Sequence, residues 1–73
     1  MQRVPVESSS LAEVGYDAAA RALEVRFRNG GVYRYHDVPP EAHAALMAAA
    51  SLGRHLNLHV KPVYPCTRIT AAR

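Results

Sequence analysis

Residues 27–39 read FRNGGVYRYHDVP, and this stretch decides the fold more than any other part of the chain. It combines a glycine-rich turn, a return segment with two tyrosines, and a Val-Pro break that leads into a helix. Just before the turn, apolar and charged side chains alternate, with Leu23, Val25 and Phe27 on the apolar side. Alternation of this kind is the period of a half-buried strand. The sequence therefore predicts an antiparallel hairpin with one apolar face.

The length of the turn decides which face the two tyrosines join. A two-residue turn at Asn29-Gly30 would place them among arginines on the open face. A three-residue turn at residues 29–31 would place them on the apolar face, because a shift of one residue moves a whole strand to the opposite side. We favour the longer turn, since Gly31 suits the left-handed position of a bulged turn. That register makes these pairs: Phe27 with Tyr33, Val25 with Tyr35, and Arg26 with Arg34.

The remaining sequence predicts an α+β domain with the order β-β-β-α-α. A first strand is expected at residues 11–16, so that the sheet is a three-stranded antiparallel meander. Two short helices follow, from Pro40 to Ala50 and from Ser51, which can cap the second helix, to Pro62. Both are expected to pack on one face of the sheet. We expect residues 1–7 to be a flexible lead-in, residues 8–69 to form one domain, and residues 70–73 to be a frayed tail. Within the domain, residues 63–65 look extended.

Size and composition favour a small binding module over an enzyme. The 73 residues can bury only a modest core, which leaves little room for a supported catalytic cleft. The net charge of +3 comes almost entirely from arginine, which suits phosphate, although a GC-rich genome would explain the arginines equally well. The single cysteine cannot form an internal disulfide, and neither a signal peptide nor a membrane span is visible. We expect a cytoplasmic protein of a bacterium or phage.

The sequence resembles the KTSC domain, a short module named for its occurrence at the C-terminus of some lysyl-tRNA synthetases and also found as a stand-alone protein in bacteria and phages. Matching residues are spread over residues 8–68: Ser8-Ser9, Val14-Gly15-Tyr16-Asp17, Leu23-Glu24-Val25-x-Phe27-x-Asn29-Gly30, Tyr33-x-Tyr35, Val38-Pro39, Ala50-Ser51-x-Gly53, Asn57 and Tyr64. His43 and Leu56 depart from the pattern, since larger or aromatic residues are expected there. The resemblance implies RNA binding only as a suggestion from the synthetase association, and it supplies no catalytic residues.

The open face of the sheet is the main candidate site. Its arginines would contact phosphates, and its tyrosines would stack on bases if the shorter turn placed them there. The site residues that we select for nucleic acid are Arg26, Arg28, Arg34, Tyr33, Tyr35 and His36. The alternative is an ordinary solvated strand face with a cross-strand Glu–His or Glu–Arg contact, and tyrosines that belong to the core.

A second basic surface is expected along the second helix. Its residues are Arg54, His55, His59 and Lys61. His55 and His59 have the i, i+4 spacing of metal ligands, and Cys66 or His43 could be a third ligand. No carboxylate is close in sequence, so we favour structural histidines and predict no metal and no cofactor. Cys66 has no base nearby and is expected to be inert. The function predicted from sequence is a non-enzymatic module that binds RNA or single-stranded nucleic acid. The alternative is a protein-interaction module that docks a partner through the second helix or the sheet edge.

Overall fold

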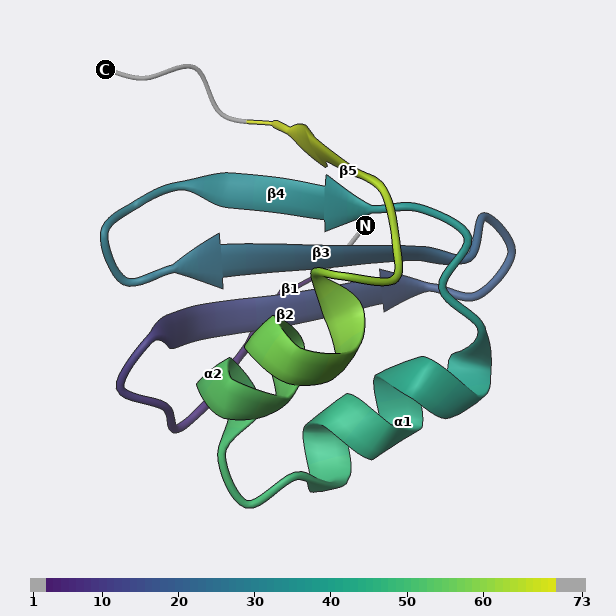
Figure 1. The fold of residues 1–73 in the computed structure, drawn as a ribbon. Coiled ribbons are helices and arrows are strands. Elements are labelled where there is room, and N and C mark those ends of the chain that lie inside the picture. The colour runs from purple at the N-terminus through teal and green to yellow at the C-terminus, as the bar shows by residue number, and fades with distance from the viewer. Residues whose placement is uncertain (1–2, 70–73) are drawn as a thin grey trace.

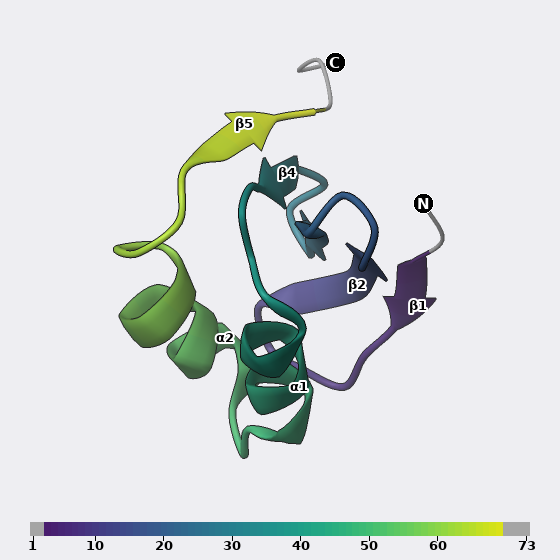
Figure 2. The same ribbon diagram turned by 90° about the vertical axis from the view of Figure 1, so that its right-hand side faces the viewer.

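Five antiparallel strands form one sheet in which strands adjacent in sequence are also adjacent in space, in the order β1-β2-β3-β4-β5 (Figure 1). This computed structural model describes residues 3–69. The strands are β1 (Arg3–Pro5), β2 (Leu11–Asp17), β3 (Ala22–Phe27), β4 (Val32–Tyr35) and β5 (Cys66–Arg68). The helices are α1 (Pro40–Ala48), α2 (Leu52–His55) and the π-helix η1 (Leu56–Val60). Both helical segments lie on one side of the sheet (Figures 1 and 2).

The α+β class is confirmed, but the prediction of three strands is wrong, because two short edge strands complete the sheet. β1 pairs with β2 and lies within the segment that we expected to be a flexible lead-in. β5 pairs with β4 after the helices, and residues 63–65, which looked extended, lie just before it in a turn and bend. Each edge strand has three residues and is largely exposed, so neither shows the alternation that reveals a longer strand. The expected frayed tail lies outside the described residues.

The turn between β3 and β4 has three residues, but it begins one residue earlier than predicted. The N–H of Gly30 donates to the carbonyl of Phe27 at 2.9 Å, and the N–H of Phe27 donates to the carbonyl of Gly31 at 2.8 Å. The loop is therefore residues 28–30, and Gly30 rather than Gly31 has the positive φ, at 100°. Glycine adopts this conformation without the steric cost that a side chain would add.

The resulting register differs from the predicted one by two residues. Tyr33 lies opposite Val25 and Tyr35 opposite Leu23. Because side chains alternate with a period of two, this difference keeps both tyrosines on the apolar face, as the longer turn predicted. It also changes the partner of every side chain on the open face, where the predicted pairing of Arg26 with Arg34 does not occur.

The helices begin where the sequence signals predicted. Proline occupies the start of α1, which ends at Ala48, two residues before the predicted end. Ser51 caps α2 as expected, because its hydroxyl accepts a hydrogen bond from the N–H of Arg54 at 3.3 Å. The second helix then widens into η1, where the N–H of Lys61 donates to the carbonyl of Leu56 at 2.9 Å, five residues back.

The core lies between the sheet and the helices. Strands β2 to β4 contribute Leu11, Val14, Leu23, Val25 and Tyr35, and the segments that follow contribute Val38, Leu46, Leu56 and Val60. Gly53 lets α2 approach the loop before β2, since a Cβ at Gly53 would stand 3.0 Å from Ser10 Oγ. The hydroxyl of Tyr16 donates to the carbonyl of Val38 at 2.6 Å, which ties β2 to the segment leading into α1.

Candidate functional site

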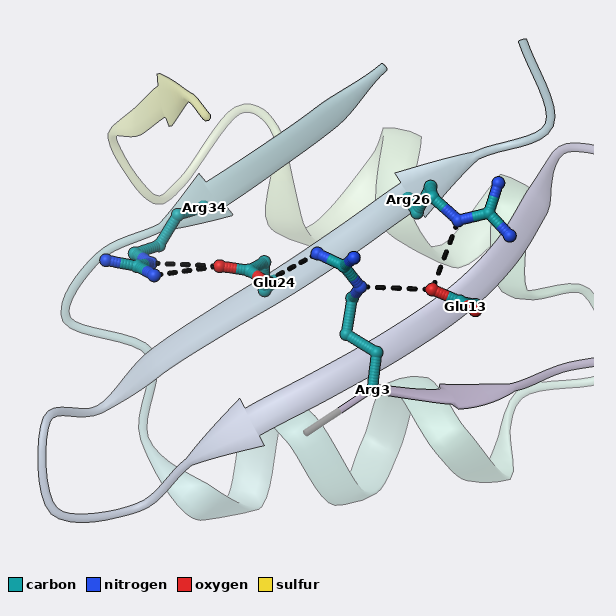
Figure 3. Close-up of polar contacts among 5 residues, drawn as sticks. All are labelled: Arg3, Glu13, Glu24, Arg26 and Arg34. Carbon is teal, nitrogen blue, oxygen red and sulfur yellow. Dashed lines mark hydrogen bonds and ion pairs between the residues drawn. The ribbon is translucent and has the colours of Figure 1, made fainter. Parts of the chain in front are cut away.

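Five charged side chains form a connected row on the face of the sheet that points away from the helices (Figure 3). Arg34 Nη2 lies 2.8 Å from Glu24 Oε2, and Arg3 Nη1 lies 2.7 Å from Glu24 Oε1. Arg3 Nε and Arg26 Nε lie 3.0 and 3.1 Å from Glu13 Oε1. We call this set the arginine–glutamate network: Arg3, Glu13, Glu24, Arg26 and Arg34.

The network neutralises most of the charge that the sequence suggested for phosphate binding. Three guanidinium groups face two carboxylates, so one net positive charge remains. Hydrogen bonds from Arg26 and Arg3 hold the pKa of Glu13 below its usual range, which keeps that carboxylate ionised. Glu24 is only 5% exposed and is held between Arg3 and Arg34. The contact that we expected as the ordinary alternative, a cross-strand Glu–Arg pair, is therefore present.

The other two predicted residues on this face also have partners within the protein. Arg28 Nε, in the turn between β3 and β4, donates to the carbonyl of Ser8, in the loop before β2, at 2.6 Å. His36 Nε2 lies 2.9 Å from the hydroxyl of Thr67 on β5. These contacts connect the hairpin to its neighbours, and they give both side chains a structural role.

The two predicted tyrosines lie on the opposite face, where they line a cavity of about 390 Å³ beside β4, β5 and η1. We call it the aromatic pocket, and its lining residues are Phe27, Asn29, Tyr33, Tyr35, Lys61 and Cys66. Tyr35 is 2% exposed and belongs to the core, which confirms the interpretation of that residue as a packing residue. Burial raises the pKa of Tyr35 to about 12, with smaller contributions from Cys66 and Tyr33, so its hydroxyl stays protonated.

Two aromatic rings and one cation, Lys61, line the aromatic pocket, and a second cation, Arg68, lies over one of these rings outside the lining. The rings of Phe27 and Tyr33 lie 5.6 Å apart at 79°, in an edge-to-face arrangement. Lys61 Nζ lies 5.3 Å from the centre of the Phe27 ring, and Arg68 Cζ lies 5.7 Å from that of Tyr33. Within residues 3–69, neither Lys61 nor Arg68 forms an ion pair, and the lining of the pocket contains no carboxylate.

The second basic surface predicted from sequence is divided by the structure. Arg54, His55 and His59 line a shallower hollow of about 250 Å³ at the end of α1 and along the second helix. The rings of His55 and His59 lie 4.7 Å apart, and the described residues contain no group of three side chains able to hold a metal. Lys61 instead lines the aromatic pocket, because the turn after η1 carries it toward Phe27.

Sequence reasoning missed four residues of the pocket region, namely Phe27, Asn29, Cys66 and Arg68. For Phe27 the sequence did contain a signal, because the alternation in β3 puts its side chain on the same face as the two tyrosines. Cys66 and Arg68 pair with Tyr35 and Tyr33 across β5, and they were missed because that strand was not predicted. Of the network, the sequence singled out Arg26 and Arg34 as site residues but not Glu13 or Arg3, and Arg3 lies on the equally unexpected β1.

Fold and site together define a small α+β domain that presents a basic aromatic pocket on one face and a nearly neutral charged network on the other. The chain belongs to the KTSC domain family, whose family model matches residues 7–64. The crystal structure of a KTSC domain protein from Yersinia pestis superposes with a TM-score of 0.91 at 42% identity, covering 94% of this chain and 97% of that one.

Two sequence relatives are similar over most of their length. An uncharacterized protein of Stutzerimonas stutzeri is 53% identical over 62 residues, which cover 85% of this chain and 87% of the relative. A protein of Tsukamurella paurometabola is 50% identical over 58 residues, with 80% and 87% covered. None of these three descriptions names a reaction or a ligand. Among the described residues, every helix is too short or too polar to cross a bilayer.

Proposed function

We propose that this chain is a non-enzymatic module that binds single-stranded nucleic acid, RNA in particular, through the aromatic pocket. One observation carries the proposal: Lys61 and Arg68 stand beside two aromatic rings with no carboxylate partner among residues 3–69. Proteins that bind single strands combine cations for the phosphates with aromatic side chains on which bases stack. The net charge of +3 favours an anionic partner.

The pocket supports this function better than the sheet face that the sequence first suggested. On that face each guanidinium of the network already meets a carboxylate within 3.1 Å. A phosphate would have to compete with Glu13 and Glu24, and it would meet their negative charge at close range. Among residues 3–69 Lys61 and Arg68 lie over ring faces and pair with no carboxylate, so a phosphate gains an ionic contact without displacing one.

Binding of a labelled single-stranded RNA by matched charge variants tests the proposal. Lys61→Gln with Arg68→Gln removes two positive charges at the pocket, and Arg26→Gln with Arg34→Gln removes two from the network. At low salt, about 50 mM, we expect the pocket pair to weaken binding about ten-fold or more and the network pair to change it only a few-fold. Circular dichroism on each variant confirms that it is folded.

The outcomes separate the two surfaces clearly. Equal losses of RNA affinity in the two double variants would mean that only the net charge matters. A larger loss in the network pair would show that RNA binds to the open face of the sheet. If the unmodified protein binds none of several RNA and DNA single strands at low salt, nucleic-acid binding itself is refuted.

A protein-docking function is the second candidate, and one observation favours it. Leu58 is 56% exposed in the second helix and lines the same hollow as Arg54, His55 and His59. Leu58, Ala49 and Ala50 give this hollow an apolar part beside its polar side chains, which is the arrangement of a small contact surface. Leu58→Asp should abolish capture of a protein partner without changing RNA affinity, whereas loss of RNA affinity in this variant would assign the helix to the nucleic-acid site.

A further inference from the structure

The geometry of the aromatic pocket indicates how much of a strand it can hold. Its volume of about 390 Å³ lies near the low end of the roughly 300–1,000 Å³ typical of small-molecule sites. The rings of Phe27 and Tyr33 are inclined at 79° to each other. Successive stacked bases are nearly parallel, so two rings at this angle cannot support two neighbouring bases of one stack. A base that lies flat on Tyr33 presents its edge to Phe27.

The charges at the pocket indicate which kind of ligand it can bind. Because Lys61 and Arg68 already cover one face of each ring, a second cation would meet repulsion there, and a cationic ligand is disfavoured. A planar group with an attached anion fits both features, since the plane can stack on Tyr33 in the lining while Lys61 in the lining and Arg68 beside it attract the anion. Asn29 accepts a hydrogen bond from the N–H of Gly31 at 3.0 Å, so its amide nitrogen remains as a donor for the edge of a base.

We propose that the aromatic pocket takes one unstacked nucleotide, with its base on Tyr33 and its phosphate between Lys61 and Arg68. This inference rests on the proposed function and specifies the ligand of the same site. The nucleotide belongs to a single strand, at an end or at a position where the strand turns away from the pocket. In a duplex, the base is paired and stacked and is not available to enter the pocket.

Cys66 provides a direct reporter of occupancy. It is the single cysteine of the chain, it is exposed, and it lines the pocket. Its rate of alkylation by uncharged iodoacetamide should fall several-fold when the pocket is occupied. The probes are uridine and adenosine 5′-monophosphates, the two nucleosides without phosphate, inorganic phosphate, and a single-stranded hexanucleotide. Glutathione alkylated under the same conditions controls for direct effects of the probes on the reagent.

The proposal predicts that a mononucleotide and the hexanucleotide protect Cys66 to a similar extent at saturation. The nucleoside lacks the phosphate, and inorganic phosphate lacks the base. Each should therefore protect Cys66 only at concentrations at least about ten-fold higher than the mononucleotide requires. Tyr33→Ala should raise the concentration of mononucleotide needed for protection, and Tyr33→Phe should not. If the hexanucleotide protects Cys66 while mononucleotides fail to do so at saturating millimolar concentration, the one-nucleotide inference is overturned and the proposed function stands. If the hexanucleotide binds without protecting Cys66, the pocket is not the site, and if it does not bind, both proposals fail.

Discussion

Arg34 on β4 lies directly opposite Glu24 on β3, and Arg34 Nη2 approaches Glu24 Oε2 to 2.8 Å. This relationship follows from a turn that begins one residue earlier than expected. With the predicted register, Arg34 would face Arg26, and the like charges would have favoured an external anion between them. With the observed register, Arg34 pairs with the carboxylate of Glu24. Its positive charge is therefore largely neutralised within the protein, and the open face attracts phosphate less strongly.

Removing the carboxylate of Glu24 should destabilise the fold. Glu24→Gln leaves Arg3 and Arg34 without their shared partner, and we expect a loss of about 1–3 kcal/mol in the free energy of unfolding, measured by urea denaturation. The loss stays below that of a fully buried pair, because the two arginine side chains are 30% and 39% exposed and regain water. Glu13→Gln is the matched control and should cost less, since its side chain is 28% exposed. An equal or greater loss in the control would contradict the role assigned to Glu24.

The position of the turn can be tested by its two glycines. Gly30→Ala forces alanine into a φ of 100° and should cost about 1–3 kcal/mol of stability. Gly31→Ala has no positive φ to maintain, and its Cβ would meet only side-chain atoms, at 3.3 Å in Tyr33 and 3.4 Å in Asn29. Its cost should therefore be smaller. If thermal unfolding showed the reverse order, the loop would have the originally predicted position at residues 29–31.

Gly53 should be required by the close approach of α2 to the loop before β2. Alanine is worth up to about 1 kcal/mol more than glycine within a helix, so Gly53→Ala would stabilise the protein if space were available. Because the new Cβ would stand 3.0 Å from Ser10 Oγ and 3.1 Å from Ser10 Cβ, we expect a net loss of about 1–2 kcal/mol instead. In a Ser10→Gly background both obstructing atoms are absent, and Gly53→Ala should cost less. An unchanged cost in that background would show that another contact excludes the alanine.

The stability of the fold should decrease as the pH falls through the range in which His43 titrates. The ring of His43 stacks on Tyr16 with centres 4.5 Å apart, and burial holds its pKa below the usual 6.5. Because the unfolded chain then binds the proton more readily, stability present at higher pH is lost as the pH falls below about 6.5.

A variant isolates this effect from the other histidines. His43→Phe keeps an aromatic ring on Tyr16 and cannot titrate. Between about pH 8 and pH 5.5, the melting temperature of the natural protein should fall further than that of the variant. Parallel curves for the two proteins would show that His43 binds protons equally well in the folded and unfolded states.

Much of the architecture could be predicted from sequence because local signals were strong. Alternation in β3, the glycine-rich turn, proline at the start of α1 and the Ser51 cap each specify local geometry, and each element formed near its expected place. The edge strands β1 and β5 could not be predicted in this way. Each has three largely exposed residues, too few to show an alternation, and β5 also pairs with a strand about thirty residues earlier in the chain.

The candidate site was harder to predict for the same reason. The pocket depends on Lys61 after η1 and on Cys66 and Arg68 in β5, which meet the hairpin only in the folded chain. The pairing on the open face depends on Glu13 and Glu24, on a two-residue difference in register, and on Arg3 in β1, which links the two carboxylates. Charges counted along the sequence pointed to Arg26 and Arg34, but they could not show that carboxylates from neighbouring strands pair with these two side chains.

Nucleic acid should bind at the aromatic pocket and not on the arginine–glutamate network, and side-chain NMR during an RNA titration distinguishes these two surfaces. Ring signals of Phe27 and Tyr33 report on the pocket, and the Nε signals of Arg26 and Arg34 report on the network. With a single-stranded RNA at low salt, we predict that the ring signals shift and saturate together while the two Nε signals stay in place, and that the shifts diminish as salt rises. Saturating shifts of the Arg26 and Arg34 Nε signals with unchanged ring signals would contradict the account.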